Sequence, residues 1–382
     1  VKLLLKNKAD IKIKDSKGQS PLALAVEKRL AHITKLILDA GGNPNGRDKN
    51  GKPLLLVAYN KFHIWTFNHL IKAKANPNIQ DDMKKPLLIS AVAAFNRAAF
   101  LQSMIKHGAN MNIKDKKGNT PLIIAASRNR YQNAVVLLRA KPKPDVNARN
   151  RRGETALFRA TKSAYLGMIN LLLKNKADPK LTNKSGDTPL IKAAATRSIR
   201  KTRIAMKVIK TFIKNGVNIN ARNRYSNTAL DKAVNMNNGL MAEFLINNGA
   251  NVNTQDKRKF TPLHKVVSTY INTRKMSDGP RNLLYLLLKK GARVNIKNKY
   301  GQTPLVMAIK MARSRNKDKV ADVVKILLEN GANKKIKDNR GRDAMRWARR
   351  KGYDKIKTAL SGSGGKKEYM DTSSLYWRTQ LI

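Results

Sequence analysis

The sequence predicts an all-α solenoid, in which short helix–turn–helix repeats stack on one another along the chain. The block Gly-x-Thr-Pro-Leu occurs at 118–122, 186–190 and 301–305, and degenerate copies fill the intervals. The hydrophobic residues that close these blocks recur every 32 to 42 residues. A repeat of this length buries its apolar face only against its neighbours. The closing residues are Leu22, Leu54, Leu87, Leu122, Leu157, Leu190, Leu230, Leu263, Leu305 and Met345.

The elements of one repeat can be followed through residues 115–141. Gly118 ends a polar turn and can adopt the positive φ that such a turn requires. Thr120 can cap the first helix, and Pro121 suits its first position, where no N–H donor is needed. Leu122 and the alanines at 125 and 126 then fall on one helical face. A second apolar stretch at 134–138 predicts the outer helix.

The repeat pattern divides the chain into four segments. Residues 1–17 form a partial N-terminal repeat, and residues 18–360 form the repeat array with its C-terminal cap. Residues 361–365 have the composition of a flexible Gly/Ser linker, and 366–382 form a tail unrelated to the repeats. Because residues 3–10 match the end of a repeat at 171–178, we expect the natural N-terminus to be missing, with any targeting signal on it. An intracellular location is favoured, and a periplasmic or secreted one stays open.

Several copies depart from the common pattern. Met83, Ser226 and Lys259 stand where glycine is expected, so their turns should be distorted. Insertions at 196–203, 268–280 and 310–319 fall between the two helices of their repeats, opposite the turns. They are interpreted as loop growth or, alternatively, as a second basic contact ridge.

The pairing of Gly-x-Thr-Pro-Leu with Gly-Ala-Asn-x-Asn, as at 249–253, resembles the ankyrin repeat family over residues 1–360. The resemblance implies ten repeats with short β-hairpin fingers and a curved stack with a concave face. It also implies a protein that binds other proteins through finger tips and inner helices.

Charge is the second dominant feature. The chain has 79 Lys plus Arg against 24 Asp plus Glu, a formal net charge of +55. Such a field attracts polyanions or acidic proteins in a salt-dependent way. There are no cysteines, which excludes disulfides, thiol catalysis and cysteine-based metal sites. No apolar run approaches the roughly 18 residues of a membrane span.

Motifs for chemistry are missing from the sequence. The five histidines are scattered over different repeats, and His264 matches a structural histidine of the ankyrin pattern. No phosphate loop, nucleophile elbow or paired-carboxylate motif occurs. We therefore expect no catalytic residues, no metal site and no cofactor.

The predicted fingers carry cations in every repeat. They predict a basic contact surface for a partner, although exposed turns in so basic a protein could also collect cations without function. The predicted partner-binding residues are Lys116, Lys117, Arg151, Arg152, Lys184, Arg222, Arg224, Tyr225, Lys257, Arg258, Phe260, Lys299, Tyr300 and Arg340.

The tail suggests a second interaction. It is richer in aromatic residues than the array, and it also contains acidic residues. It is interpreted as a peptide ligand tethered to the array, a natural extension or a tag. In the first case its anchors would be Tyr369, Tyr376 and Trp377, because buried aromatics dominate binding energy.

Together these features predict a non-enzymatic, monomeric scaffold that binds an acidic or peptide-like protein partner on its concave basic face. An inhibitor or immunity role is one form of this function. The alternative is a module that binds a polyanion: nucleic acid, the ribosome or an anionic membrane. The fingers offer only Tyr225, Phe260 and Tyr300 for base stacking, which argues against single-strand binding.

Overall fold

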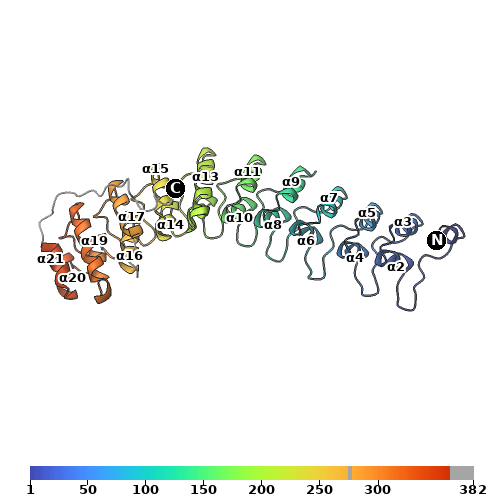
Figure 1. Ribbon diagram of the computed structural model, residues 1–382, viewed down its shortest axis with the longest axis horizontal. Coiled ribbons are helices and arrows are strands. Elements are labelled where there is room, and N and C mark those ends of the chain that lie inside the picture. The colour runs from blue at the N-terminus through green and yellow to red at the C-terminus, as the bar shows by residue number, and fades with distance from the viewer. Residues whose placement is uncertain (274–277, 362–382) are drawn as a thin grey trace. The chain divides into compact units, whose positions relative to one another are not determined.

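The computed structural model describes residues 1–273 and 278–361, which form two compact units. Unit 1 spans Val1–Asp178 and unit 2 spans Pro179–Ile382. Each unit is a series of paired helices joined by projecting turns (Figure 1). Ser361, the first residue of the predicted linker, ends the last helix, and the rest of the linker and the tail, from 362 onward, lie outside the described residues.

Unit 1 begins with the short helix α1 and continues as helix pairs. Its helices are α1 (Lys2–Lys6), α2 (Pro21–Glu27), α3 (Ala31–Asp39), α4 (Leu54–Asn60), α5 (Ile64–Lys72), α6 (Leu87–Ala93), α7 (Ala98–Lys106), α8 (Pro121–Ser127), α9 (Tyr131–Arg139), α10 (Ala156–Ser163) and α11 (Leu166–Lys174).

Unit 2 continues the same alternation. Its helices are α12 (Pro189–Ala194), α13 (Ile199–Lys214), α14 (Ala229–Asn235), α15 (Gly239–Asn247), α16 (Pro262–Asn272), α17 (Asp278–Lys289), α18 (Pro304–Lys310), η1 (Ser314–Asn316), α19 (Lys317–Glu329), α20 (Ala344–Lys351) and α21 (Asp354–Ser361).

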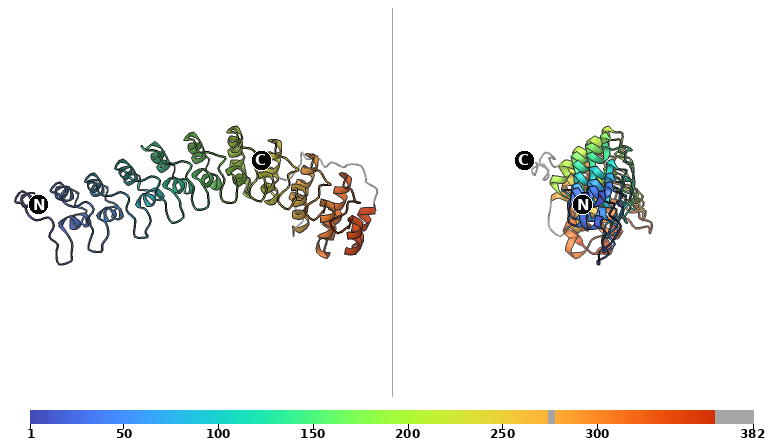
Figure 2. Two further views of the ribbon diagram at one scale, coloured as in Figure 1. Left: turned by 180° about the vertical axis from the view of Figure 1, so that it is seen from behind. Right: turned by 90° about the vertical axis from the view of Figure 1, so that its right-hand side faces the viewer.

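Within each unit the helices form two rows. First helices pack on first helices, as α6 on α8 and α8 on α10, and second helices pack on second helices, as α3 on α5. In unit 1 the turns extend beyond the row of first helices, which Figure 2 shows from behind. The core consists of aliphatic residues on the facing sides, such as Leu122, Leu157, Leu190 and Leu263. The predicted all-α solenoid is therefore confirmed.

The Thr-Pro-Leu block starts the first helix of a repeat as the sequence predicts. Thr120 Oγ1 accepts a hydrogen bond from the Ile123 N–H at 3.3 Å, and Pro121 occupies the first helical position. Such a cap stabilises a helix by about 1 kcal/mol. In α4 and α6 the N-cap residue is instead Pro53 or Pro86, whose side chain cannot accept a hydrogen bond.

The second motif, Asn-x-Asn, links one repeat to the next. In unit 2, Asn220 Oδ1 accepts from the Asn251 N–H at 2.8 Å, and Asn253 Oδ1 accepts from the Arg293 N–H at 2.8 Å. These bonds give partners to exposed backbone N–H groups that lie between the helices. The motif therefore fixes the spacing of successive repeats.

The fingers are hydrogen-bonded turns. Among the described residues, β pairing is limited to isolated bridges such as Arg47–Pro53 and Gln80–Pro86. The expectation that Met83 takes the glycine position is wrong: Lys84 adopts the left-handed conformation, with φ +55°. This repeat has one residue fewer before its proline, which moves the position by one. Ser226 and Lys259 do replace glycine, at φ +59° and +58°.

The insertions differ from simple loop growth. The insertion at 196–203 supplies the first turn of α13, whose Thr202 is buried together with Ala205 and Ile209 further along the helix. These residues continue one packed face, so the extra residues became helix. The insertion at 310–319 forms η1 and the start of α19. In the insertion at 268–280, residues 274–277 lie outside the described part.

Candidate basic interaction surface of the fingers

Each finger in unit 2 is held by one polar side chain at its start. Asn223 Oδ1 accepts from the N–H groups of Tyr225 and Asn227, at 2.9 and 3.0 Å. Asn183, Asp256, Asn298 and Asp338 hold their own fingers in the same way. Because this side chain turns inward, the residues that follow it lie at the exposed tip.

Backbone hydrogen bonds join neighbouring tips. Within unit 2 the N–H of Arg224 donates to Ser185 O at 3.0 Å, that of Lys257 to Tyr225 O at 3.1 Å, and that of Lys299 to Arg258 O at 3.0 Å. In unit 1 the N–H of Arg151 donates to Lys117 O at 3.0 Å. The tips are therefore held in register. We call the following set the finger row of unit 2: Lys184, Arg224, Tyr225, Lys257, Arg258, Lys299, Tyr300 and Arg340.

Glycine is required where one finger approaches the next. Gly186 has φ +75°, and a Cβ built on it would lie 2.7 Å from the backbone N of Arg224. At Gly301 the corresponding distance, to the backbone N of Asn339, is 2.6 Å. Both the conformation and the close approach therefore exclude a side chain.

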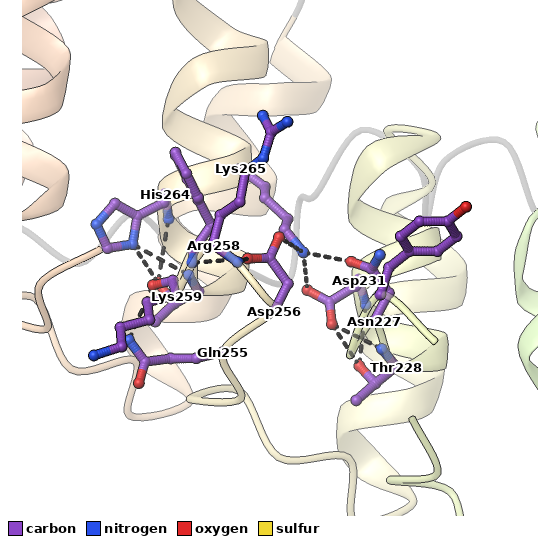
Figure 3. Close-up of polar contacts among 12 residues, drawn as sticks. Asn227, Thr228, Asp231, Gln255, Asp256, Arg258, Lys259, His264 and Lys265 are labelled. Atoms are coloured by element: carbon purple, nitrogen blue, oxygen red, sulfur yellow. Dashed lines mark hydrogen bonds and ion pairs between the residues drawn. The ribbon is translucent and has the colours of Figure 1, made fainter. Parts of the chain in front are cut away.

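A buried ionic network lies behind the finger row (Figure 3). Lys265 Nζ, whose side chain is 10% exposed, lies 2.7 Å from Asp231 Oδ1 and 3.1 Å from Asp256 Oδ2, and it also donates to Asn227 Oδ1. It joins the repeat that contains α14 to the repeat that contains α16. The two carboxylates are thereby neutralised within the fold rather than presented to a ligand.

His264 is part of the same packing. Its side chain is buried, its Nδ1 contacts Thr261, and its Nε2 lies 3.0 Å from Gln302 O in the next repeat. Burial lowers the pKa of His264 to about 4, so the ring is neutral at ordinary pH. This histidine is structural, as the sequence pattern indicates.

The structure places every predicted finger cation at an exposed position, in two groups. Lys116, Lys117, Arg151 and Arg152 belong to unit 1, whereas Lys184, Arg222, Arg224, Lys257, Arg258, Lys299 and Arg340 belong to unit 2. Two predicted aromatic residues are exposed, Tyr225 at 60% and Tyr300 at 44%.

Phe260 differs from the other predicted residues, because it is half-buried and packs edge-on against His264 and Tyr300. The predicted tail anchors Tyr369, Tyr376 and Trp377 lie outside the described residues.

Other kinds of site receive no support in the part of the chain that the structure describes. There, no three side chains of His, Asp or Glu come together as metal ligands would. Over the same residues, none of the helices combines the length and apolarity needed to cross a membrane.

Sequence reasoning missed one group of residues next to the finger row. Lys310 of α18 and Trp347, Arg350 and Lys351 of α20 line a cleft together with Tyr300 and Arg340. The spacing of Trp347, Arg350 and Lys351 is i, i+3 and i+4, which places them on one helical face. This spacing is visible in the sequence, but it does not show which side chains of other repeats lie opposite the face.

The stacked helix pairs and projecting fingers of each unit define a helical repeat protein. A family model described as "Ankyrin repeats (3 copies)" matches residues 1–81, 88–183, 163–256 and 274–371. The chain belongs to the ankyrin repeat family. Ankyrin repeats are in general protein–protein interaction modules.

The chain is similar to parts of several known proteins. Human B-cell lymphoma 3 protein is 27% identical over 203 residues, 52% of this chain and 44% of that protein. Potassium channel AKT2/3 of Arabidopsis thaliana is 31% identical over 146 residues, 38% of this chain and 17% of the channel. Neurogenic locus notch homolog protein 1 of Danio rerio is 29% identical over 138 residues, 36% of this chain and 5% of that protein.

Among solved structures, the ankyrin repeat domain of Bcl-3, an IkappaB family member, matches with a TM-score of 0.49 and 24% identity. The match covers 62% of this chain and 97% of that domain. The chain spans less than half the length of each of the three relatives above.

Proposed function

We propose that this protein is a non-enzymatic scaffold and that the finger row of unit 2 binds an acidic surface of a protein partner. The observation that carries the proposal is a set of cations held in register by backbone hydrogen bonds between neighbouring tips. Because the backbone of the tips is already held by these bonds, it loses little conformational freedom on binding, which favours association with a charge-complementary surface.

The acidic side chains of these fingers turn away from the tips. Asp187 accepts from Asn223 Nδ2 at 2.7 Å, Asp256 pairs with Lys265, and Asp338 pairs with Arg342 at 3.1 Å. The exposed tips therefore keep their positive charge. A monomer that covers a partner's active surface, as an inhibitor does, is one form of this function.

Nucleic acid is the competing ligand, because the net charge of +55 attracts any polyanion. The packing of the finger aromatics favours a protein instead. Phe260 is half-buried against His264 and Tyr300, so it offers little face for stacking a base. Only Tyr225 and Tyr300 of the finger row then remain to stack on bases, which is few for a surface that binds single-stranded nucleic acid.

Affinity capture followed by mass spectrometry tests the proposal at low and at moderate salt, with and without nuclease. The row variant carries Arg224→Glu, Arg258→Glu and Lys299→Glu. The control carries Lys201→Glu, Lys207→Glu and Lys214→Glu on α13, which change the charge equally at exposed positions of an outer helix. We expect an acidic protein that survives nuclease, is captured by the control and is lost by the row variant. Capture that nuclease abolishes would replace the protein partner with nucleic acid.

A further inference from the structure

A basic cleft of about 600 Å³ lies in unit 2 beside the end of the finger row. It is bounded by the finger at 298–302, the finger at 338–342, the end of α18 and one face of α20. Both walls come from consecutive repeats of one unit, and their tips are joined by the bond from the Asn339 N–H to Tyr300 O at 3.1 Å. The cleft is therefore a fixed part of the fold.

The cleft contains one acid and five cations. Its lining includes Asp338 and the cations Lys310, Arg340, Arg342, Arg350 and Lys351, a formal balance of 5 − 1 = +4. Asp338 is fully engaged: its Oδ2 accepts from Arg342 at 3.1 Å and from Trp347 Nε1 at 3.0 Å, and its Oδ1 accepts from two backbone N–H groups. Arg342 is thus neutralised inside the wall.

Among the remaining cations, Lys351 Nζ donates to Ala312 O at 3.1 Å. Burial lowers the pKa of the Lys351 ammonium, and so does the positive charge of Arg313, Arg350 and Lys310 nearby. Burial alone would raise the pKa of Asp338, but hydrogen bonds from Arg342, Trp347 and Arg340 hold it at about 2. The cleft therefore has a positive electrostatic potential, because the single carboxylate of Asp338 does not neutralise all of its cations.

Aromatic rings hold the cations in place. The Trp347 ring, which is 6% exposed, has Arg342 Cζ 4.1 Å from its centroid and both Lys310 Nζ and Arg350 Cζ at 5.8 Å. Lys310 Nζ also lies 5.8 Å from the Tyr300 ring. Cation–π contacts of this kind orient the cations before a ligand arrives. They also cover the tryptophan, which argues against base stacking in the cleft.

We propose that this cleft binds an anionic peptide segment of the protein partner, one with closely spaced carboxylates or a phosphorylated side chain. Arginine and lysine donors recognise both groups through charge-assisted hydrogen bonds. The inference rests on the proposed function, because it assigns the cleft to a protein ligand. The chain's own residues 366–382 fit less well, since they carry three Lys or Arg against two Asp or Glu.

The experiment measures fluorescence anisotropy of labelled peptides with the full chain. One peptide contains four consecutive Asp and Glu residues, the second replaces them with Asn and Gln, and the third carries phosphoserine. A short oligothymidine is the fourth probe. We expect the acidic or the phosphorylated peptide to bind, the amide peptide not to bind, and the oligothymidine to bind more weakly.

Matched variants locate the site. The cleft variant carries Lys310→Gln, Arg340→Gln and Arg350→Gln, and its control carries Arg315→Gln, Arg346→Gln and Arg349→Gln, which are exposed and do not line the cleft. Each lost charged hydrogen bond should weaken binding about tenfold. The cleft variant should therefore bind the anionic peptide at least about tenfold more weakly than its control does.

Three results would overturn the inference: equal loss in both variants, equal binding of the amide peptide, or tighter binding of oligothymidine. The cleft variant could still capture the partner while the finger-row variant does not. That result would refute peptide binding in the cleft and would leave the proposed function of the finger row unaffected.

Discussion

Substitution of Lys265 by methionine tests whether the ionic network behind the fingers holds unit 2 together. Lys265 Nζ lies 2.7 Å from Asp231 Oδ1 and 3.1 Å from Asp256 Oδ2, and the side chains of these carboxylates are 0% and 15% exposed. Methionine keeps the length of the side chain and removes the charge. Two carboxylates in a region of low dielectric are then left without a counter-charge, and such a loss costs about 3–5 kcal/mol.

Urea unfolding followed by circular dichroism measures the effect on the free energy of unfolding. Lys265→Met combined with Asp231→Asn and Asp256→Asn should recover most of the loss. Asparagine already holds the turns equivalent to that of Asp256, at Asn223 and Asn298, and an amide oxygen at position 231 can still accept from the Thr228 N–H. Lys355→Met, which breaks an exposed pair with Asp318, should leave the midpoint unchanged. A cost below about 1 kcal/mol for Lys265→Met would refute the reasoning.

Two further predictions concern the fingers and pH. Gly186→Ala should lower the free energy of unfolding more than Gly341→Ala does. Both glycines have positive φ, but only a Cβ at 186 would meet the backbone of Arg224, so equal urea midpoints for the two variants would contradict the prediction. His264 has a folded-state pKa of about 4 against an ordinary value of 6.5, so the unfolded chain binds its proton first as pH falls. Its contribution, about 3 kcal/mol, is present above pH 6.5 and is lost between 6.5 and 4. His264→Gln should flatten the plot of unfolding free energy against pH between pH 4 and 6.5. An unchanged slope in that range would count against a buried, neutral His264.

The sequence determined the fold because its motifs have local causes. Thr120 caps a helix and Gly186 allows a turn, and both effects can be predicted from residue type alone. The position of the left-handed residue near Met83 was predicted one place off, because the deletion shifted the turn and the pattern does not record which residue then adopts positive φ. The first turn of α13 was missed because an insertion has no repeat register to compare with.

The candidate site could be predicted only in part. Exposed finger cations follow from turn chemistry, since the residues after an inward Asn or Asp must face outward. The cleft needs two fingers and two helices from consecutive repeats, and single-sequence reasoning does not bring Lys310 to Trp347. Likewise, the role of Asp256 as a buried partner of Lys265 depends on how two repeats stack.

Zero-length carboxyl–amine crosslinking of the captured complex tests the central claim most directly. The reaction joins a lysine to a carboxylate only where the two groups are in contact, so it reports which lysines face the acids of the partner. The account predicts crosslinks from Lys184, Lys257 and Lys299, and few from Lys201, Lys207 and Lys214, which are also exposed. Crosslinks concentrated on the lysines of α13, with the finger lysines unmodified, would contradict it.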